Sequence, residues 1–224
     1  MNTFVIGDVH GCFHTLQNLI KKLPKKSDLI FVGDLCDRGK FSKEVIEFVM
    51  SNNYRCIKGN HETYVVDFLE DVLFKNKKNI NWLKKGWGGK ATVKSYKKED
   101  LSYIKKHLSW IERLPAYFYI DKKYLISHGY ALPYFKRRDS NDEKVKHALM
   151  CNRINDKKYK ESWEDVSDYK VINIFGHCKF DEVLVGKNYY GIDTGCSYKN
   201  KLTAIQLGTM KIVQEETSEL DLAK

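Results

Sequence analysis

The sequence predicts an α/β protein in which two β-sheets pack as a sandwich and outer helices flank them. Two observations lead to this fold class. The first sixty residues repeat a short apolar strand, a polar strand end and a helix, so that Asp34 follows Asp8 by 26 residues and Asn60 follows Asp34 by 26. The second half is rich in short apolar strands separated by turns. The repeat has about the length of a βαβ crossover, so we expect a βαβαβ unit of parallel strands at the N-terminus.

Each element of the N-terminal unit follows from an apolar pattern. Strands are predicted at 4–6, 29–32 and 54–58, and each leads into a glycine and a polar residue. Apolar residues at helical spacing predict a helix that Pro24 ends, and a second helix that contains 45–49. Open α/β sheets bind ligands at the carboxyl ends of their parallel strands, so these polar residues should gather at one edge.

The region from about 63 to 115 is predicted to be a helical insert. Its clearest helix runs from 99 to 114, where the apolar residues form one stripe and Pro115 follows. Beyond the insert, apolar runs at 117–120 and 124–127 flank a three-residue loop, which predicts a β-hairpin.

The remaining elements complete the predicted second half. After a helix near 141–150, strands are expected at 171–175, 183–185, 189–192, 202–207 and 211–213. The last residues, 214–224, are polar and are expected to fray. No linker or low-complexity tract interrupts the chain, so we expect residues 1–224 to form one catalytic domain.

Composition limits the classes of function. The 224 residues are 42% hydrophobic and 30% charged, which is typical of a soluble globular protein. No apolar stretch approaches the roughly 20 residues that a membrane helix needs. The N-terminus has no basic leader or cleavage site, so we expect a cytoplasmic protein without membrane contact. The six cysteines form no CxxC pair and are expected to be reduced thiols.

The formal net charge of +10 raises the question of a nucleic-acid partner. The lysines, however, are spread along the chain in short runs, and only 136–138 forms a denser basic cluster. Scattered lysines are typical of a solvated surface, so nucleic acid is not the expected partner. A positive field would also attract phosphorylated substrates, which is the preferred interpretation.

The polar residues that follow the predicted strands have the chemistry of a metal site. Six of them offer carboxylate, amide or imidazole groups: Asp8, His10, Asp34, Asn60, His128 and His177. Oxygen and nitrogen ligands without a thiolate suit two divalent first-row metal ions, with Mn²⁺ the first expectation and Fe²⁺ or Zn²⁺ as alternatives. Asp34 lies on the middle one of three loops, so its carboxylate is the natural bridge. Two such ions would acidify a shared water and neutralise phosphate oxygens.

Three short motifs resemble those of a known family. They are Gly-Asp-Val-His-Gly at 7–11, Gly-Asp-Leu-Cys-Asp-Arg-Gly at 33–39 and Gly-Asn-His-Glu at 59–62. Together they are similar to the signature of the phosphoprotein phosphatase family of calcineurin-like metallophosphoesterases, in particular its short bacterial and phage members of the lambda phosphatase type. Further landmarks follow in the expected order: Trp87-Gly88-Gly89, Ser127-His128-Gly129, Asn152-Arg153, Gly176-His177 and Ile192-Asp193-Thr194-Gly195. The resemblance covers nearly the whole chain.

The resemblance implies a role for each matched residue. The first metal ion would be held by Asp8, His10 and Asp34, and the second by Asp34, Asn60, His128 and His177. His61 would protonate the leaving alkoxide, and Asp37 would orient it. The substrate phosphate would be bound by Arg38, Arg153 and Asn60, since a guanidinium matches two phosphate oxygens. A hydroxide bridging the metal ions would attack in line, so that no phosphoenzyme forms.

Two substrate classes fit these motifs. Asp37, Arg38 and Glu62 favour a metal-dependent protein phosphatase that acts on phosphoserine and phosphothreonine, with phosphotyrosine as a further substrate. The alternative is a symmetrical diadenosine tetraphosphate hydrolase, because such enzymes share the scaffold and carry segments similar to 193–196. A purely binding function is disfavoured, since every matched metal and acid position is filled. Cys36, between two site aspartates, is a candidate for oxidation-sensitive inactivation.

Overall fold

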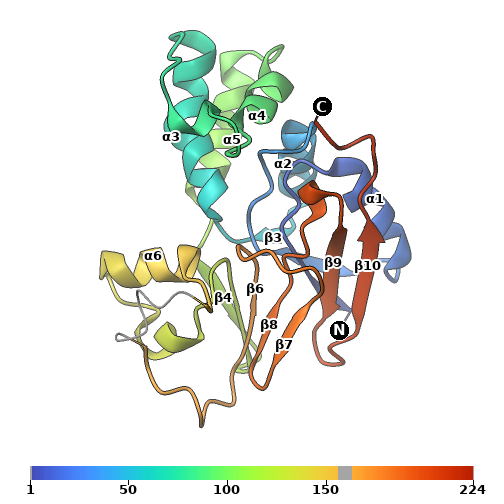
Figure 1. Ribbon diagram of the computed structural model, residues 1–224, viewed down its shortest axis with the longest axis vertical. Helices are drawn as coiled ribbons and strands as arrows, with labels where there is room; N and C mark the ends of the chain where they lie inside the picture. The colour runs from blue at the N-terminus through green and yellow to red at the C-terminus, as the bar shows by residue number, and fades with distance from the viewer. Residues whose placement is uncertain (1, 156–162, 224) are drawn as a thin grey trace.

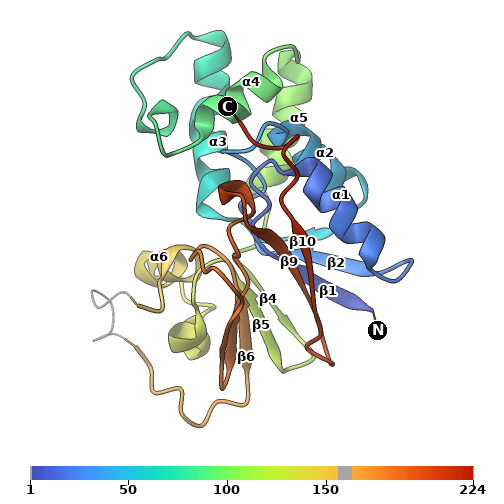
Figure 2. The same cartoon turned by 45° about the vertical axis from the view of Figure 1, so that its right-hand side comes forward.

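Two five-stranded mixed sheets pack together at the centre of the computed structural model, and helices lie on their outer sides (Figures 1 and 2). The structure describes residues 2–155 and 163–223. The strand order is β10-β9-β1-β2-β3 in the first sheet and β4-β5-β6-β8-β7 in the second. The predicted two-sheet α/β fold is therefore confirmed.

The elements have the following bounds. The first sheet contains β1 (Thr3–Ile6), β2 (Asp28–Phe31), β3 (Arg55–Cys56), β9 (Lys201–Gln206) and β10 (Ile212–Glu216). The second contains β4 (Tyr117–Ile120), β5 (Tyr124–Ser127), β6 (Ile172–Phe175), β7 (Leu184–Gly186) and β8 (Tyr189–Gly191). The α-helices are α1 (Phe13–Lys22), α2 (Ser42–Ser51), α3 (Asn60–Phe74), α4 (Gly89–Tyr96), α5 (Leu101–Glu112) and α6 (Glu143–Cys151). Short 3₁₀ helices lie at Asn81–Leu83, Leu132–Arg137 and Cys196–Tyr198.

The N-terminal strands form the predicted βαβαβ unit. β1 pairs with β2, and β2 with β3, both in parallel, so their carboxyl ends point to the same edge of the sheet. β3 is shorter than the predicted strand at 54–58, because only Arg55 and Cys56 pair with β2. Past this strand the chain leaves the sheet, and the backbone N–H of Lys58 donates to the carbonyl of Pro115 at 2.9 Å. The predicted hairpin of 117–120 and 124–127 is present as β4 and β5.

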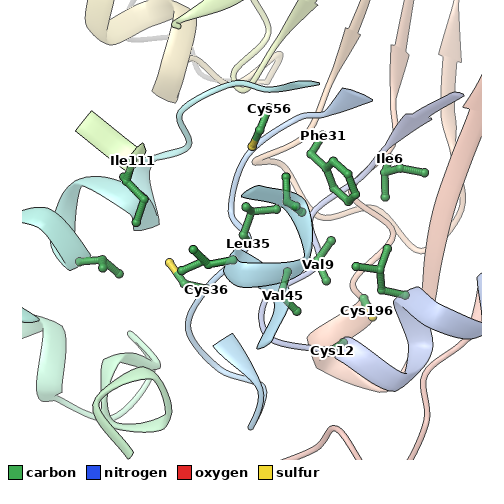
Figure 3. Close-up of a cluster of buried hydrophobic side chains, with 14 of the residues drawn as sticks. Ile6, Val9, Cys12, Phe31, Leu35, Cys36, Val45, Cys56, Ile111 and Cys196 are labelled. Atoms are coloured by element: carbon green, nitrogen blue, oxygen red, sulfur yellow. The ribbon is translucent and has the colours of Figure 1, made fainter. Parts of the chain in front are cut away.

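Alternating side chains divide the core into an inter-sheet layer and outer layers. In β1, Val5 lies in the cluster between the two sheets, whereas Phe4 and Ile6 lie in the cluster beneath the helices. The helix-side cluster also buries Leu35 and Cys36, which belong to a loop after β2 (Figure 3). Apolar residues inside the polar loop thus fix its backbone to the core.

The insert between β3 and β4 is helical, as predicted, and α3, α4 and α5 form its main body (Figure 1). The predicted helix at 99–114 is α5, two residues shorter at each end. It begins after Asp100 because that carboxylate accepts the backbone N–H of Tyr103 at 2.8 Å and caps the first turn. Among the described residues, no helix combines the length and hydropathy needed to cross a bilayer.

The prediction that the C-terminal residues from 214 onward fray is wrong, because this segment is paired and packed. β10 pairs with β9 as far as Glu216, and the side chain of Asp221 is completely buried against the start of α1. Its carboxylate accepts the backbone N–H groups of His14 at 3.0 Å and Thr15 at 2.8 Å, and the Thr15 hydroxyl at 2.7 Å. The preceding residue Cys12 provides no side-chain cap for this helix, so Asp221 supplies one from the far end of the chain.

Candidate active site

The polar residues that follow β1, β2, β3, β5 and β6 come together at one edge of the two sheets. Several of them adopt positive φ angles, which L-residues rarely do: His10 (46°), Asp34 (50°), Asp37 (71°), Arg38 (66°) and His177 (62°). Such backbone strain persists only where surrounding contacts hold it, and it is common at functional sites.

Asp34 is at the centre of the cluster. Its Oδ1 lies 3.2 Å from Nε2 of His128, and its Oδ2 lies 3.5 Å from Nε2 of His10. Among the described residues, two groups of potential ligand atoms lie within 4.8 Å of one another, and Asp34 belongs to both. One group contains His10 and His61, and the other contains Asp8 and His128. This geometry suits a carboxylate that bridges two cations.

Asn60, at the first residue of α3, joins the later histidines to this centre. Its Oδ1 lies 2.8 Å from Nδ1 of His177 and 3.1 Å from Nε2 of His128. The other ring nitrogen of His128 donates to the carbonyl of Val32 at 2.7 Å, so Nε2 is the ring nitrogen that faces the cluster. All the residues that sequence analysis selected as metal ligands therefore face the same centre.

The cluster fits divalent cations because it brings buried carboxylate and imidazole groups together. The carboxylate of Asp8 is 2% exposed, and among the described residues it accepts only the backbone N–H of His177, at 3.1 Å. A buried carboxylate with so little compensation is costly unless a cation is nearby. Burial and the neighbouring charge of Asp193 accordingly raise the pKa of Asp8 well above its usual value.

Burial and neighbouring charges also shift the pKa values of Asp34, His128 and His177. Burial opposes ionisation of Asp34, but the imidazoles of His128 and His61 hold its pKa well below the usual range. Burial also disfavours charged His128, but Asp34 outweighs this effect and raises the pKa of His128 to about 10. Burial and the charge of His128 lower the pKa of His177 to about 3. His128 therefore favours its protonated form, and the neighbouring His177 favours its neutral form. Bound cations would take over the role of the proton in balancing the carboxylates.

Two glycines allow the backbone to pass close to the carboxylates of the cluster. A Cβ on Gly176 would lie 2.0 Å from Oδ1 of Asp8, and a Cβ on Gly59 would lie 2.2 Å from Oδ1 of Asp34. Any side chain at either position would displace a carboxylate of the cluster.

His61 forms a hydrogen-bonded pair with Asp37. Its Nδ1 lies 2.6 Å from Oδ2 of Asp37, so its Nε2 is the atom that faces the cluster. The helical insert holds Asp37 in place: Trp82 Nε1 donates to Oδ2 at 2.7 Å, and the hydroxyl of Thr92 donates to Oδ1 at 2.6 Å. Trp82 was not predicted as a site residue, because an indole 45 positions away gives no sequence signal of this contact.

Glu62 has a role that the sequence motif did not reveal. Its buried carboxylate accepts the backbone N–H groups of Asp34 at 2.7 Å, Leu35 at 2.8 Å and Gly59 at 2.8 Å. It therefore ties the loop after β2 to the start of α3. A signal was available, since a glutamate at the third position of a helix is typical of a capping box.

A cavity of about 360 Å³ opens beside the metal-ligand candidates. Arg38 and Arg153 bring positive charge to its wall, and Tyr64 and Trp87 bring aromatic rings. The guanidinium of Arg38 contacts the Nε2 atoms of both His10 and His61. Arg153 is exposed and lines this cavity.

The environment of Cys36 does not support a reactive thiol. The side chain is completely buried, and its Sγ donates to Glu62 at 3.5 Å. Burial and the surrounding carboxylates raise its pKa well above the usual value, whereas nucleophilic thiols have lowered pKa values and exposure. All six cysteines are free.

A fold of two stacked mixed sheets with a carboxylate–imidazole cluster at the strand ends defines a metallophosphoesterase. The model of the calcineurin-like phosphoesterase family matches residues 1–205, and the chain belongs to this family. It is accordingly a hydrolase whose family uses divalent metal ions.

The chain is similar to proteins named as bis(5'-nucleosyl)-tetraphosphatases and, in fold, to a serine/threonine phosphatase. The chain is 28% identical to a bis(5'-nucleosyl)-tetraphosphatase PrpE, of the asymmetrical type, from Anoxybacillus flavithermus, over 93% of this chain and 91% of that protein. It is 31% identical to a symmetrical bis(5'-nucleosyl)-tetraphosphatase from Buchnera aphidicola, over 68% of this chain and 52% of that protein. A serine/threonine phosphatase structure from Saccharomyces cerevisiae has the same fold, with a TM-score of 0.58 and 16% identity, over 99% of this chain and 81% of that chain.

Proposed function

We propose that this metallophosphoesterase hydrolyses dinucleoside polyphosphates of the bis(5'-nucleosyl)-tetraphosphate class. The motifs alone favoured a protein phosphatase, but the full-length similarity to a tetraphosphatase supports the dinucleotide alternative. Relatives with the symmetrical and the asymmetrical activity both occur, so the products distinguish two versions of the proposal. Symmetrical cleavage of diadenosine tetraphosphate gives two ADP, and asymmetrical cleavage gives ATP and AMP.

The observation that carries this proposal is the mixed lining of the cavity. Its guanidinium groups suit the oxygens of a phosphate chain, because each can donate two parallel hydrogen bonds. The ring of Trp87 is 38% exposed and meets Tyr64 edge-on, with ring centroids 5.1 Å apart. An exposed indole beside phosphate-binding arginines is a suitable platform for a nucleobase.

The proposed metal ligands are those that converge on Asp34. Asp8, His10 and Asp34 would hold one cation, and Asp34, Asn60, His128 and His177 would hold the other. Bound cations of this kind supply a nucleophile at neutral pH and neutralise charge on the phosphate. Mn²⁺ is the proposed metal, since oxygen and nitrogen ligands of this type suit it.

The proposed work of the remaining residues is positioning and proton transfer. Arg38, Arg153 and Asn60 would orient the phosphate to be cleaved. His61 would donate a proton from Nε2 to the departing oxygen, because its Nδ1 is bound to Asp37. Trp82 and Thr92 would keep the Asp37 carboxylate in the orientation that holds the ring.

A phosphoprotein substrate is the second candidate, and the His61–Asp37 pair favours it. A serine or threonine alkoxide leaves poorly and needs a well-placed acid, whereas a nucleotide phosphate leaves more easily. The deciding experiment compares kcat/KM on diadenosine tetraphosphate and on a phosphoserine peptide with Mn²⁺ supplied. We expect a preference of roughly a hundredfold for the dinucleotide. An equally large preference for the peptide would overturn the proposal.

A matched pair of variants tests the aromatic platform. Trp87→Ala should lower kcat/KM for diadenosine tetraphosphate by about tenfold, since stacking on a base contributes about 1–3 kcal/mol. The same variant should retain its activity on p-nitrophenyl phosphate, which has no nucleobase. Phe74→Ala removes another exposed aromatic ring, outside the cavity, and should change neither activity.

A further inference from the structure

A second and larger cavity lies on the outer side of α4. Its volume is about 780 Å³, and it is enclosed by the start of α2, by α4 with the residues that follow it, and by the C-terminal segment at Ala223. It shares no lining residue with the cavity beside the metal-ligand candidates. Figure 2 shows the C-terminal segment passing beside α4 and α2.

Lysine side chains dominate this cavity. Six line it: Lys40, Lys43, Lys90, Lys94, Lys97 and Lys98. Lys43 is neutralised by Glu99 at 2.7 Å and Glu44 at 3.6 Å, which are the acidic residues of the wall, and Lys40 donates to the carbonyl of Leu220 at 2.9 Å. Among the described residues, no carboxylate lies within 4.0 Å of the five ammonium groups other than that of Lys43. The cavity therefore gathers positive charge that carboxylates of the described residues leave largely uncompensated.

The rest of the lining is suited to a compact ligand. Phe41, Ala91 and Ala223 contribute apolar surface between the lysines. A volume of this size is within the range of small-molecule sites, roughly 300–1,000 Å³. The ion-paired Glu44 and Glu99 on the wall disfavour a long polyanion that would run across them. Several lysines around a partly apolar surface instead suit a short chain of phosphates, with or without an attached nucleoside.

We propose that this lysine-lined cavity is a second binding site, separate from the active site, for a polyphosphate chain such as that of a nucleoside triphosphate. Helix α4 contacts Asp37 on one side and lines this cavity on the other. Its inner face carries Thr92, which holds Asp37, and its outer face carries Lys90 and Lys94. The backbone N–H of Arg38 donates to the carbonyl of Gly88 at 3.2 Å, directly before this helix. A ligand in the cavity would therefore contact the helix that positions the proposed acid pair.

The test measures binding to EDTA-treated full-length protein by isothermal titration calorimetry, with ATP and inorganic tripolyphosphate as separate probes. We expect Lys90→Ala/Lys94→Ala to weaken binding by about tenfold or more, because hydrogen bonds to charged groups are lost. Lys105→Ala/Lys144→Ala removes the same charge from exposed helical positions outside the cavity and should leave binding unchanged. Hydrolysis of p-nitrophenyl phosphate should be equal in both double variants.

The remaining outcomes separate the two sites and the two ligand sources. If Arg38→Ala/Arg153→Ala abolishes binding and Lys90→Ala/Lys94→Ala does not weaken it, the probes bind only in the active site and the proposal is wrong. Tighter binding of ATP than of tripolyphosphate would support a nucleotide ligand, and equal binding would support the phosphate chain alone. Should the α4 variant unfold, Lys97→Ala/Lys98→Ala, beyond the end of the helix, provides the same test.

Discussion

Asp34 and Asp221 are both aspartates with almost no exposure, 2% and 0%, yet their surroundings are opposite. Asp221 is surrounded by donors: two backbone N–H groups and a hydroxyl reach its carboxylate, as does the ring of His14 at 2.9 Å. Asp34 accepts the backbone N–H of His61 at 3.0 Å and otherwise faces imidazole nitrogens and other oxygens. A buried carboxylate that is satisfied by N–H and hydroxyl donors serves as a structural link, and one that faces imidazole and carboxylate side chains is suited to cations.

Asp37 is intermediate between these two cases. The indole of Trp82 and the hydroxyl of Thr92 satisfy it on the insert side, while its Oδ2 also engages His61. Asp37 thus links the insert to the site, and it also orients His61 for the proposed proton transfer. The comparison predicts that substitutions at the three aspartates and their partners change activity and stability in different proportions.

The largest effect on activity is expected for Asp34→Asn. Loss of the proposed metal-bridging carboxylate should remove several kcal/mol of transition-state stabilisation, on the order of 10³-fold or more in kcat/KM. Added Mn²⁺ should raise the thermal unfolding temperature of the unsubstituted protein by mass action and should have little effect on the variant. Asp71→Asn, at a half-buried position of α3 outside the site, is the control. Full activity and Mn²⁺ response in Asp34→Asn would show that this carboxylate holds no metal.

Trp82→Phe should have the next largest effect. The ring remains in the core, but the N–H that donates to Asp37 is lost, and outer contacts of this kind are worth about 10–100-fold in activity. The measurement is kcat on diadenosine tetraphosphate at saturating substrate, with the unfolding midpoint measured in parallel. A drop in stability at unchanged kcat would mean that Trp82 only packs the insert.

Asp221→Asn should lower the stability of the protein and leave its activity nearly unchanged, the opposite of the effect expected for Asp34→Asn. It weakens the remote cap of α1 and should cost about 2 kcal/mol of unfolding free energy, while kcat with saturating metal changes less than about threefold. Urea unfolding followed by circular dichroism measures the first quantity. Glu219→Gln, a neighbouring exposed residue, is the matched control. An unchanged urea midpoint in Asp221→Asn would contradict the role of this residue as a link.

The smallest effect is expected for Cys36→Ser. Because the thiol is buried and its pKa is raised, peroxide should inactivate the variant and the unsubstituted protein at the same rate. The comparison is made by following residual activity over time at one peroxide concentration. Clear protection in the variant would restore the hypothesis that Cys36 is an oxidation-sensitive residue.

The sequence predictions were accurate where the deciding residues lie close together in the chain, and less accurate where they lie far apart. The βαβαβ unit and its strand ends were predictable, because apolar runs, glycines and polar residues follow one another within a few positions. Helix ends were less accurate, since a single cap such as Asp100 decides them. The C-terminal segment was predicted wrongly, because its polar residues find partners about 200 positions away.

By itself, the sequence determined the fold class and the polar groups that follow the strands, because hydrophobic periodicity and short motifs are local properties. Only the tertiary structure decided how each of these groups is surrounded. Which buried carboxylate is satisfied by backbone N–H and hydroxyl donors, and which faces a cluster of imidazoles and carboxylates, depends on contacts between distant segments. For the same reason, the Trp82 contact with Asp37 and the lysine-lined cavity on α4 became visible only in the folded chain.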